Sequence, residues 1–105
     1  MATSLKIKGY SSEKKTLLWE VDFVNWWDTD EILEQFPCEI NVEPSYTDYH
    51  ITIDKKDALS LHERYRNRAF KWWQDSVKTL DENLNKQLPD KGKVELYIYE
   101  WESGL

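Results

Sequence analysis

The strongest candidate for chemistry in this sequence is a row of polar side chains around His50, one of two histidines in the chain. The segment from residue 46 to residue 53 alternates, so that Asp48, His50 and the following Asp54 share one side. Two carboxylates and an imidazole form a donor set that can hold a cation. One hypothesis is therefore a small enzyme or metal-binding domain that uses Asp48, His50 and Asp54, although strand alternation alone produces such rows.

Other catalytic signatures are missing from the sequence. His62 is followed by Glu63, but the second histidine of a zinc protease motif is absent. The chain has no glycine-rich phosphate loop, no pair of cysteines and no Gly-x-Ser-x-Gly elbow. Glu20 and Asp22 lie two residues apart without an aligned acid–base partner. We therefore expect no enzymatic activity, no catalytic residues, no metal and no cofactor.

The elements that must position these residues belong to one domain over residues 1–105, a length typical of a single domain. Hydrophobic residues make up 40% of the chain and charged residues 32%, with few glycines and prolines, which is typical of a folded chain.

Alternation of apolar and polar residues predicts five strands. Segments 5–9 and 16–24 form one predicted hairpin, and segments 38–43 and 46–53 form another. In the last strand an apolar row faces away from an acidic and aromatic row: Val94, Leu96 and Ile98 against Glu95, Tyr97, Tyr99 and Trp101.

Two helices are predicted between these strands. Asp28 with Glu31 fits a helix N-cap signature, and Asp54 with Asp57 fits a second one before a helix over residues 56–87. The apolar stripe of that helix follows steps of three and four: Ala58, Leu61, Tyr65, Ala69, Trp72, Ser76, Leu80 and Leu84. At 1.5 Å per residue it would span about 45 Å and would have to kink or overhang the sheet.

The predicted fold class is therefore α+β, in the order β-β-α-β-β-α-β. A mostly antiparallel sheet of about five strands has one long amphipathic helix packed on one face.

Charge is distributed unevenly along the chain, whose formal net charge is −6. From Thr16 to Asp54 there is no lysine or arginine but ten acids: Glu20, Asp22, Asp28, Asp30, Glu31, Glu34, Glu39, Glu43, Asp48 and Asp54. From Lys55 to Lys78 there are seven bases and three acids. A surface of one sign repels itself and favours a partner of opposite sign, whose approach it accelerates. We therefore expect a basic protein partner.

Two other interpretations of the charge stay open. In the first, the basic helix lies beside the acidic interval and neutralises it within the protein. In the second, the bases between Arg64 and Lys71 contact nucleic acid. Phosphate binding needs clustered cations, whereas these alternate with Glu63, Tyr65, Asn67 and Phe70. We expect no direct binding of nucleic acid.

Six tryptophans are many for so short a chain, and four of them form adjacent pairs: Trp26-Trp27 and Trp72-Trp73. Neighbouring residues point about 100° apart on a helix and to opposite faces on a strand, so one core position cannot hold both. The pairs either plug the ends of the domain or anchor an interface, since tryptophan and tyrosine are enriched at binding hot spots. The row of Tyr97, Tyr99 and Trp101 is either a covered sheet face or an exposed binding strip.

The compartment is expected to be the cytoplasm. The single cysteine, Cys38, cannot form an internal disulfide, which favours a reducing environment. No apolar run approaches the ~20 residues needed to span a bilayer. The first ten residues lack the apolar region of a secretory signal, and we expect no membrane contact.

An acidic, tryptophan-rich α+β domain of this size, with acids alone over residues 16–54 and no catalytic signature, resembles the bacterial immunity proteins of polymorphic and contact-dependent toxin systems. The resemblance implies non-catalytic binding to a cognate toxin domain, often a basic nuclease, at its active site or a neighbouring surface. Expected partner-binding residues are the carboxylates that steer, the tryptophans that anchor and the C-terminal aromatic row: Glu20, Asp22, Trp26, Trp27, Asp28, Asp30, Glu31, Glu34, Tyr97, Tyr99 and Trp101.

Reversal of Asp28, Asp30 and Glu31 to lysine is expected to slow association and to leave the fold intact. Besides the small enzyme or metal site, the alternatives are a self-associating structural protein that pairs through the Tyr97–Trp101 row or the long helix, and a phage inhibitor that mimics the charge of nucleic acid. The oligomeric state stays open.

Overall fold

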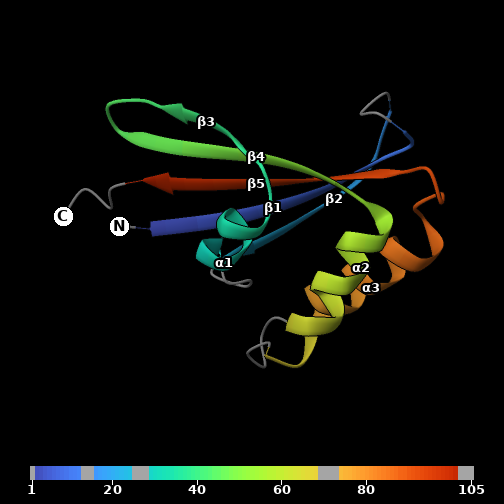
Figure 1. Ribbon diagram of the computed structural model, residues 1–105. Coiled ribbons are helices and arrows are strands. Elements are labelled where there is room, and N and C mark those ends of the chain that lie inside the picture. The colour runs from blue at the N-terminus through green and yellow to red at the C-terminus, as the bar shows by residue number, and fades with distance from the viewer. Residues whose placement is uncertain (1, 13–15, 25–28, 69–73, 102–105) are drawn as a thin grey trace.

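A five-stranded antiparallel sheet with helices against one face makes up the computed structural model, which describes residues 2–12, 16–24, 29–68 and 74–101 (Figure 1). In chain order the elements are β1 (Ala2–Tyr10), β2 (Leu17–Val24), α1 (Thr29–Gln35), β3 (Glu39–Val42), β4 (Tyr46–Asp54), α2 (Lys55–Tyr65), the 3₁₀ turn η1 (Arg66–Arg68), α3 (Gln74–Lys86) and β5 (Lys93–Trp101). The order across the sheet is β2-β1-β5-β4-β3, so β2 and β3 are the edges. The α+β class and the antiparallel sheet are confirmed.

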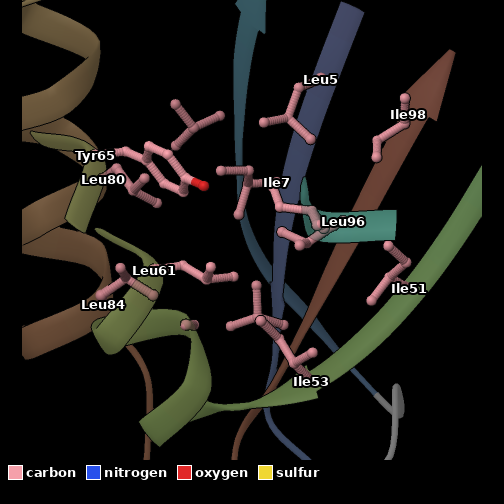
Figure 2. Close-up of a cluster of buried hydrophobic side chains, with 14 of the residues drawn as sticks. Leu5, Ile7, Ile51, Ile53, Leu61, Tyr65, Leu80, Leu84, Leu96 and Ile98 are labelled. Carbon is pink, nitrogen blue, oxygen red and sulfur yellow. The ribbon is translucent and has the colours of Figure 1, made fainter. Parts of the chain in front are cut away.

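The hydrophobic core lies between the helices and one face of the sheet. Alternate residues of the three central strands form its floor, because β1 pairs Leu5 with Ile98 and Ile7 with Leu96 of β5. Side chains of α2 and α3 point at this floor (Figure 2), among them Leu61, Tyr65, Leu80 and Leu84, all nearly or fully buried. Each such side chain contributes about 1.5–3 kcal/mol when it leaves water. The predicted apolar sides of β4 and β5 are therefore confirmed.

Both predicted hairpins are present, β1 with β2 and β3 with β4. In the second hairpin Pro44 and Ser45 form the loop, and the backbone N–H of Glu43 donates to the carbonyl of Tyr46 at 2.8 Å. A proline at this place favours a tight turn because its φ is already set. Such a short loop fixes the register of β3 against β4, and therefore which face each side chain takes.

The single long helix predicted over residues 56–87 is wrong. α2 ends at Tyr65, η1 follows, and α3 lies beside α2 (Figure 1). Strands β4 and β5 have nine residues each, or about 30 Å at 3.3 Å per residue. A continuous helix of about 45 Å would project past them, whereas two helices of 11 and 13 residues both bury their apolar sides on the sheet. The order of elements in the structure therefore has α2 and α3 where the prediction had one helix.

The predicted cap of α2 is confirmed, because Asp54 Oδ1 accepts a hydrogen bond of 2.9 Å from the backbone N–H of Asp57. The cap proposed for α1, Asp28, lies outside the described residues. In the described parts of the chain, every helix is too short or too polar to cross a bilayer.

His62 links α2 to α3 from a buried position. Its Nε2 lies 3.2 Å from Asp81 Oδ1 on α3, while its buried Nδ1 has no hydrogen-bond partner among the described residues. Burial lowers the pKa of His62, and the carboxylate of Asp81 opposes that effect without cancelling it. The folded protein therefore favours the neutral imidazole.

We expect acidification to destabilise the fold through His62. The pKa of His62 is lower in the folded than in the unfolded chain, so the unfolded chain binds more protons as the pH falls below about 6.5, the ordinary value for histidine. The contribution of the neutral His62 to the free energy of unfolding is therefore complete above that pH and is lost as the pH falls below it. Denaturant unfolding between pH 7.5 and pH 5 should show a shallower pH dependence for His62→Gln than for the wild-type protein. Equal slopes would contradict this account.

Candidate functional site

The face of the sheet opposite the helices is covered by no described element (Figure 1). Because side chains alternate along a strand, the neighbours of core residues point to this open face. On β4 these are Tyr46, Asp48 and His50, and on β5 they are Glu95, Tyr97, Tyr99 and Trp101. The open face is therefore where most of the predicted chemistry and the predicted aromatic row come together.

Four aromatic rings form what we call the aromatic strip: Tyr46, Tyr97, Tyr99 and Trp101. Tyr99 is its centre, with ring centroids 5.0 Å from Tyr46, 5.3 Å from Trp101 and 6.3 Å from Tyr97. All four side chains are half-buried. Since no described element covers this face, the contacts between neighbouring rings contribute to their burial.

A buried carboxylate lies beside the strip. Asp48 is only 6% exposed, and its Oδ2 accepts from the Tyr97 hydroxyl at 3.3 Å and from Asn41 Nδ2 at 3.5 Å. Its Oδ1 lies 3.3 Å from His50 Nε2, yet it accepts no hydrogen bond from any described residue. A buried carboxylate oxygen without a donor is costly, so positive charge brought to this place is stabilised.

His50 stands between Asp48 and a second buried carboxylate. Glu95 is 7% exposed, and its Oε2 lies 3.8 Å from His50 Nδ1. The imidazole also contacts the ring of Tyr97 edge-on, with centroids 4.7 Å apart. Burial raises the pKa of Tyr97, and the neighbouring Asp48 carboxylate adds to the effect, so the tyrosine hydroxyl stays protonated and donates.

The cation site hypothesised from Asp48, His50 and Asp54 does not assemble. Asp54 is occupied as the cap of α2, and the second carboxylate beside the imidazole is Glu95 of β5 instead. Within the described ranges no three histidine, cysteine, aspartate or glutamate side chains are placed to share a metal ion.

Two open hollows flank the strip and the buried carboxylates. One, of about 250 Å³, is lined by Pro37, Cys38, Glu39, His50 and Thr52. The other, of about 120 Å³, lies at the β3–β4 turn and is lined by Glu43, Pro44, Ser45, Tyr46, Thr47, Glu100 and Trp101. Each has at least one carboxylate in its lining and is large enough for one side chain of a partner.

Several of the acids predicted to meet a partner already have partners in the protein. Lys6 Nζ of β1 lies 2.9 Å from Glu20 Oε1 and 3.8 Å from Asp22 Oδ1. The contact between Lys6 and Glu20 lowers the pKa of Glu20 and raises that of Lys6. Glu31 accepts from Arg64 Nη1 at 2.6 Å and from the hydroxyl of Tyr65. Neutralisation by the basic helix is therefore found for Glu31, whereas Glu20 and Asp22 are paired with Lys6 of β1, outside the predicted basic segment.

The other predicted residues divide into two groups. Asp30 and Glu34 are exposed on α1 and form no ion pair with a described residue. Trp26, Trp27 and Asp28 lie outside the described residues. Among the described residues, Tyr97, Tyr99 and Trp101 therefore lie together on one face of the sheet, and the predicted acids of β2 and α1 lie elsewhere.

Sequence reasoning missed three members of this face: Tyr46, Asp48 as a buried residue, and Glu95. The alternation of β4 and β5 puts each on the correct side of its strand. What the sequence lacks is the register that sets Tyr46 opposite Trp101 and Asp48 opposite Tyr99.

Comparison of the chain with protein-family models, with curated proteins and with solved structures found no match.

Proposed function

We propose that this protein binds a basic protein without catalysis, as an immunity protein binds its toxin domain, and that the aromatic strip is the centre of the interface. The observation that carries the proposal is the combination, on a face that no described element covers, of four neighbouring aromatic rings with the buried carboxylates Asp48 and Glu95. We further propose a bacterial origin and a reducing cytoplasm, the latter supported by the free thiol of Cys38.

Aromatic rings beside carboxylates suit the side chains of arginine and lysine. A guanidinium over the face of a tyrosine or tryptophan gains about 0.5–2 kcal/mol, the larger values when water is excluded. The same cation would offset the negative charge of Asp48, whose Oδ1 receives no hydrogen bond from the described residues. Tyrosine and tryptophan are also the usual anchors of binding hot spots.

Exposed acids on both sides of the sheet would add long-range attraction. Glu39 and Glu43 lie on and after β3, and Asp30 and Glu34 lie on α1, all exposed to solvent. Charges of this kind raise the association rate more than the affinity, and salt screens them over about 8–10 Å. Association with the partner should therefore slow as salt is added.

The test uses the genes that flank the gene of this protein. Each flanking product is expressed alone and together with this protein in a bacterial host. The proposal expects one of them to arrest growth alone, and co-expression to restore growth. If no flanking product is toxic or binds the protein, the immunity assignment is contradicted.

Tyr99→Ala is expected to weaken binding to that product by about tenfold or more, because it removes the central ring of the strip. Thr79→Ala, on the exposed side of α3, is the control and should bind like the wild-type protein. Calorimetry or surface plasmon resonance measures both. Equal affinity of the two variants would place the interface away from the strip.

Self-association through the strip is the competing function. Two strips face to face would bring Asp48, Glu95 and their counterparts in the second copy together, and like charges at an interface cost several kcal/mol. A sedimentation experiment that gives a dimer lost in Tyr99→Ala would favour this alternative over a foreign partner.

A further inference from the structure

We propose that the free edge of β3 accepts an extended segment of the partner as a sixth strand, and that this segment alternates apolar with basic residues. The inference rests on the proposed function, since it specifies how part of a basic partner is bound. It concerns a different surface from the aromatic strip, so the two can be tested separately.

The outer edge of β3 has backbone groups at two residues that pair with no described strand. The N–H of Glu43 donates to the carbonyl of Tyr46. Hydrogen-bonded and non-hydrogen-bonded pairs alternate along an antiparallel ladder, so Asn41 opposite Asp48 is a hydrogen-bonded pair as well. The intervening Ile40 and Val42 therefore direct their N–H and C=O groups away from β4. An added strand could pair with both residues.

The side chains of the same two residues are apolar and uncovered. Ile40 is 58% exposed and Val42 is 73% exposed, the largest values among the large hydrophobic side chains that the structure describes. Their opposite residues on β4 are Tyr49 and Thr47, on the side of the sheet where the helices lie. Proteins usually blunt such an edge with lysine, proline or a bulge within the strand. β3 has its short length, the charge of Glu39 and the flanking Pro37 and Pro44, but it has no lysine and no proline within the strand.

Charge selects the kind of strand that fits. Glu39 and Glu43 are exposed at the two ends of β3 and form no ion pair with a described residue. Elsewhere in the sheet the same pattern is already satisfied, because the alternating strand Leu5-Lys6-Ile7-Lys8 pairs with β2 and brings Lys6 to Glu20. β3 thus alternates acidic and apolar residues as β2 does. β2 has the basic strand β1 beside it, whereas no described strand lies beside the outer edge of β3.

A second copy of the chain fits this edge poorly. Antiparallel pairing of β3 with itself around Asn41 would set Glu39 directly opposite Glu43 twice, and like charges opposite one another destabilise a ladder. Lysine or arginine at those positions of a foreign strand would reverse the sign. The hollow lined by Glu39 and His50 adds room for one such side chain.

The experiment titrates the ¹⁵N-labelled protein with a capped synthetic peptide of sequence Lys-Val-Lys-Ile-Lys-Val-Lys and follows amide hydrogen exchange. We expect the amides of Ile40 and Val42 to exchange at least tenfold more slowly at saturation. The amide of Asn41, already paired with β4, should change little. A peptide with glutamate in place of each lysine is the charge control and should not protect these amides.

Two variants at one position separate the backbone from the side chain. Val42→Pro removes the outward N–H without touching the ladder to β4, a place where an edge strand tolerates proline. Val42→Ala keeps that N–H. We expect Val42→Pro to lose protection of Ile40 and to bind the peptide at least tenfold more weakly than Val42→Ala. Retained β3–β4 amide protection in the free variant shows that it is folded.

Three results would overturn the inference. The peptide could shift the resonances of Tyr97, Tyr99 and Trp101 without protecting Ile40 and Val42, which leaves the proposed function standing and removes the added strand. Val42→Pro and Val42→Ala could bind equally. Protection of Ile40 and Val42 could also appear in the free protein as its concentration rises, and a second copy would then be the occupant.

Discussion

Replacing Glu31 with lysine is expected to lower the free energy of unfolding by about 2–3 kcal/mol, a range set by the loss of a hydrogen bond between a charged and a neutral group. The carboxylate of Glu31 on α1 accepts from the hydroxyl of Tyr65, whose side chain is 1% exposed at the end of α2. Lysine cannot accept this bond, so the buried hydroxyl of Tyr65 would lose the Glu31 acceptor. The lysine would also stand beside Arg64, where the present ion pair, half exposed, contributes little.

The measurement is chemical denaturation at neutral pH, with Glu34→Lys as the matched control. Glu34 lies on the same helix, is exposed and makes no ion pair with the described residues, so its reversal should change stability by less than about 0.5 kcal/mol. Glu31→Gln keeps an acceptor and should fall between the two. Equal stability of Glu31→Lys and Glu34→Lys would show that the contact with Tyr65 is not made in solution.

This result matters for any test of electrostatic steering. The combined reversal of Asp28, Asp30 and Glu31 was expected from the sequence to leave the fold intact, but the structure makes Glu31 a link between α1 and α2. Loss of binding in that triple variant would therefore mix unfolding with lost attraction. Asp30→Lys with Glu34→Lys tests steering alone, because both side chains are exposed.

Strand alternation in the sequence was sufficient to assign the two faces of the sheet. Ile51 and Ile53 on β4 and Val94, Leu96 and Ile98 on β5 are buried, as their spacing predicts. A period of two admits only two choices of face, and the apolar side takes the core. The same rule predicts that Tyr97, Tyr99 and Trp101 share the other face of β5.

The helical region could not be read in the same way. The stripe predicted over one helix includes Ser76, yet the buried residue of that turn is Val77, followed by Leu80 and Leu84. Both helices of the pair face the sheet, so apolar residues recur every three or four positions on either side of the turn. No proline or glycine lies between residues 54 and 88 to mark the interruption. Only the length of the strands decides that the chain must fold back.

The candidate site also depends on pairings between distant residues. The contact of Tyr97 with Asp48 joins positions 49 apart, and that of Tyr65 with Glu31 joins positions 34 apart. The first contact holds the carboxylate of Asp48 on the open face. The second holds the carboxylate of Glu31 against α2, away from that face. Charge counted along the chain treats the two acids alike, because the strand order that separates them is a property of the whole sheet.

Gly9→Ala is expected to destabilise the protein by about 2–3 kcal/mol, the upper part of the range for overpacking. Gly9 lies on the core side of β1, and its opposite residue on β2 is Trp19. A Cβ at Gly9 would come within 2.2 Å of Trp19 Cε2 and 2.5 Å of Cζ2. These atoms belong to the rigid indole, so the whole ring would have to turn away. The gain of about 0.5–1 kcal/mol that alanine brings to a strand is smaller than this cost.

A double-mutant cycle separates the clash from other effects of the substitution. With Trp19→Ala as background the new methyl group has room, so Gly9→Ala should then cost less than about 0.5 kcal/mol or become stabilising. A penalty that stays the same in both backgrounds would contradict the clash. Because the indole rests on the bare backbone of Gly9, one of the six tryptophans is explained by packing alone. The search for aromatic anchors therefore belongs on the opposite face, where the rings of the strip meet no described element.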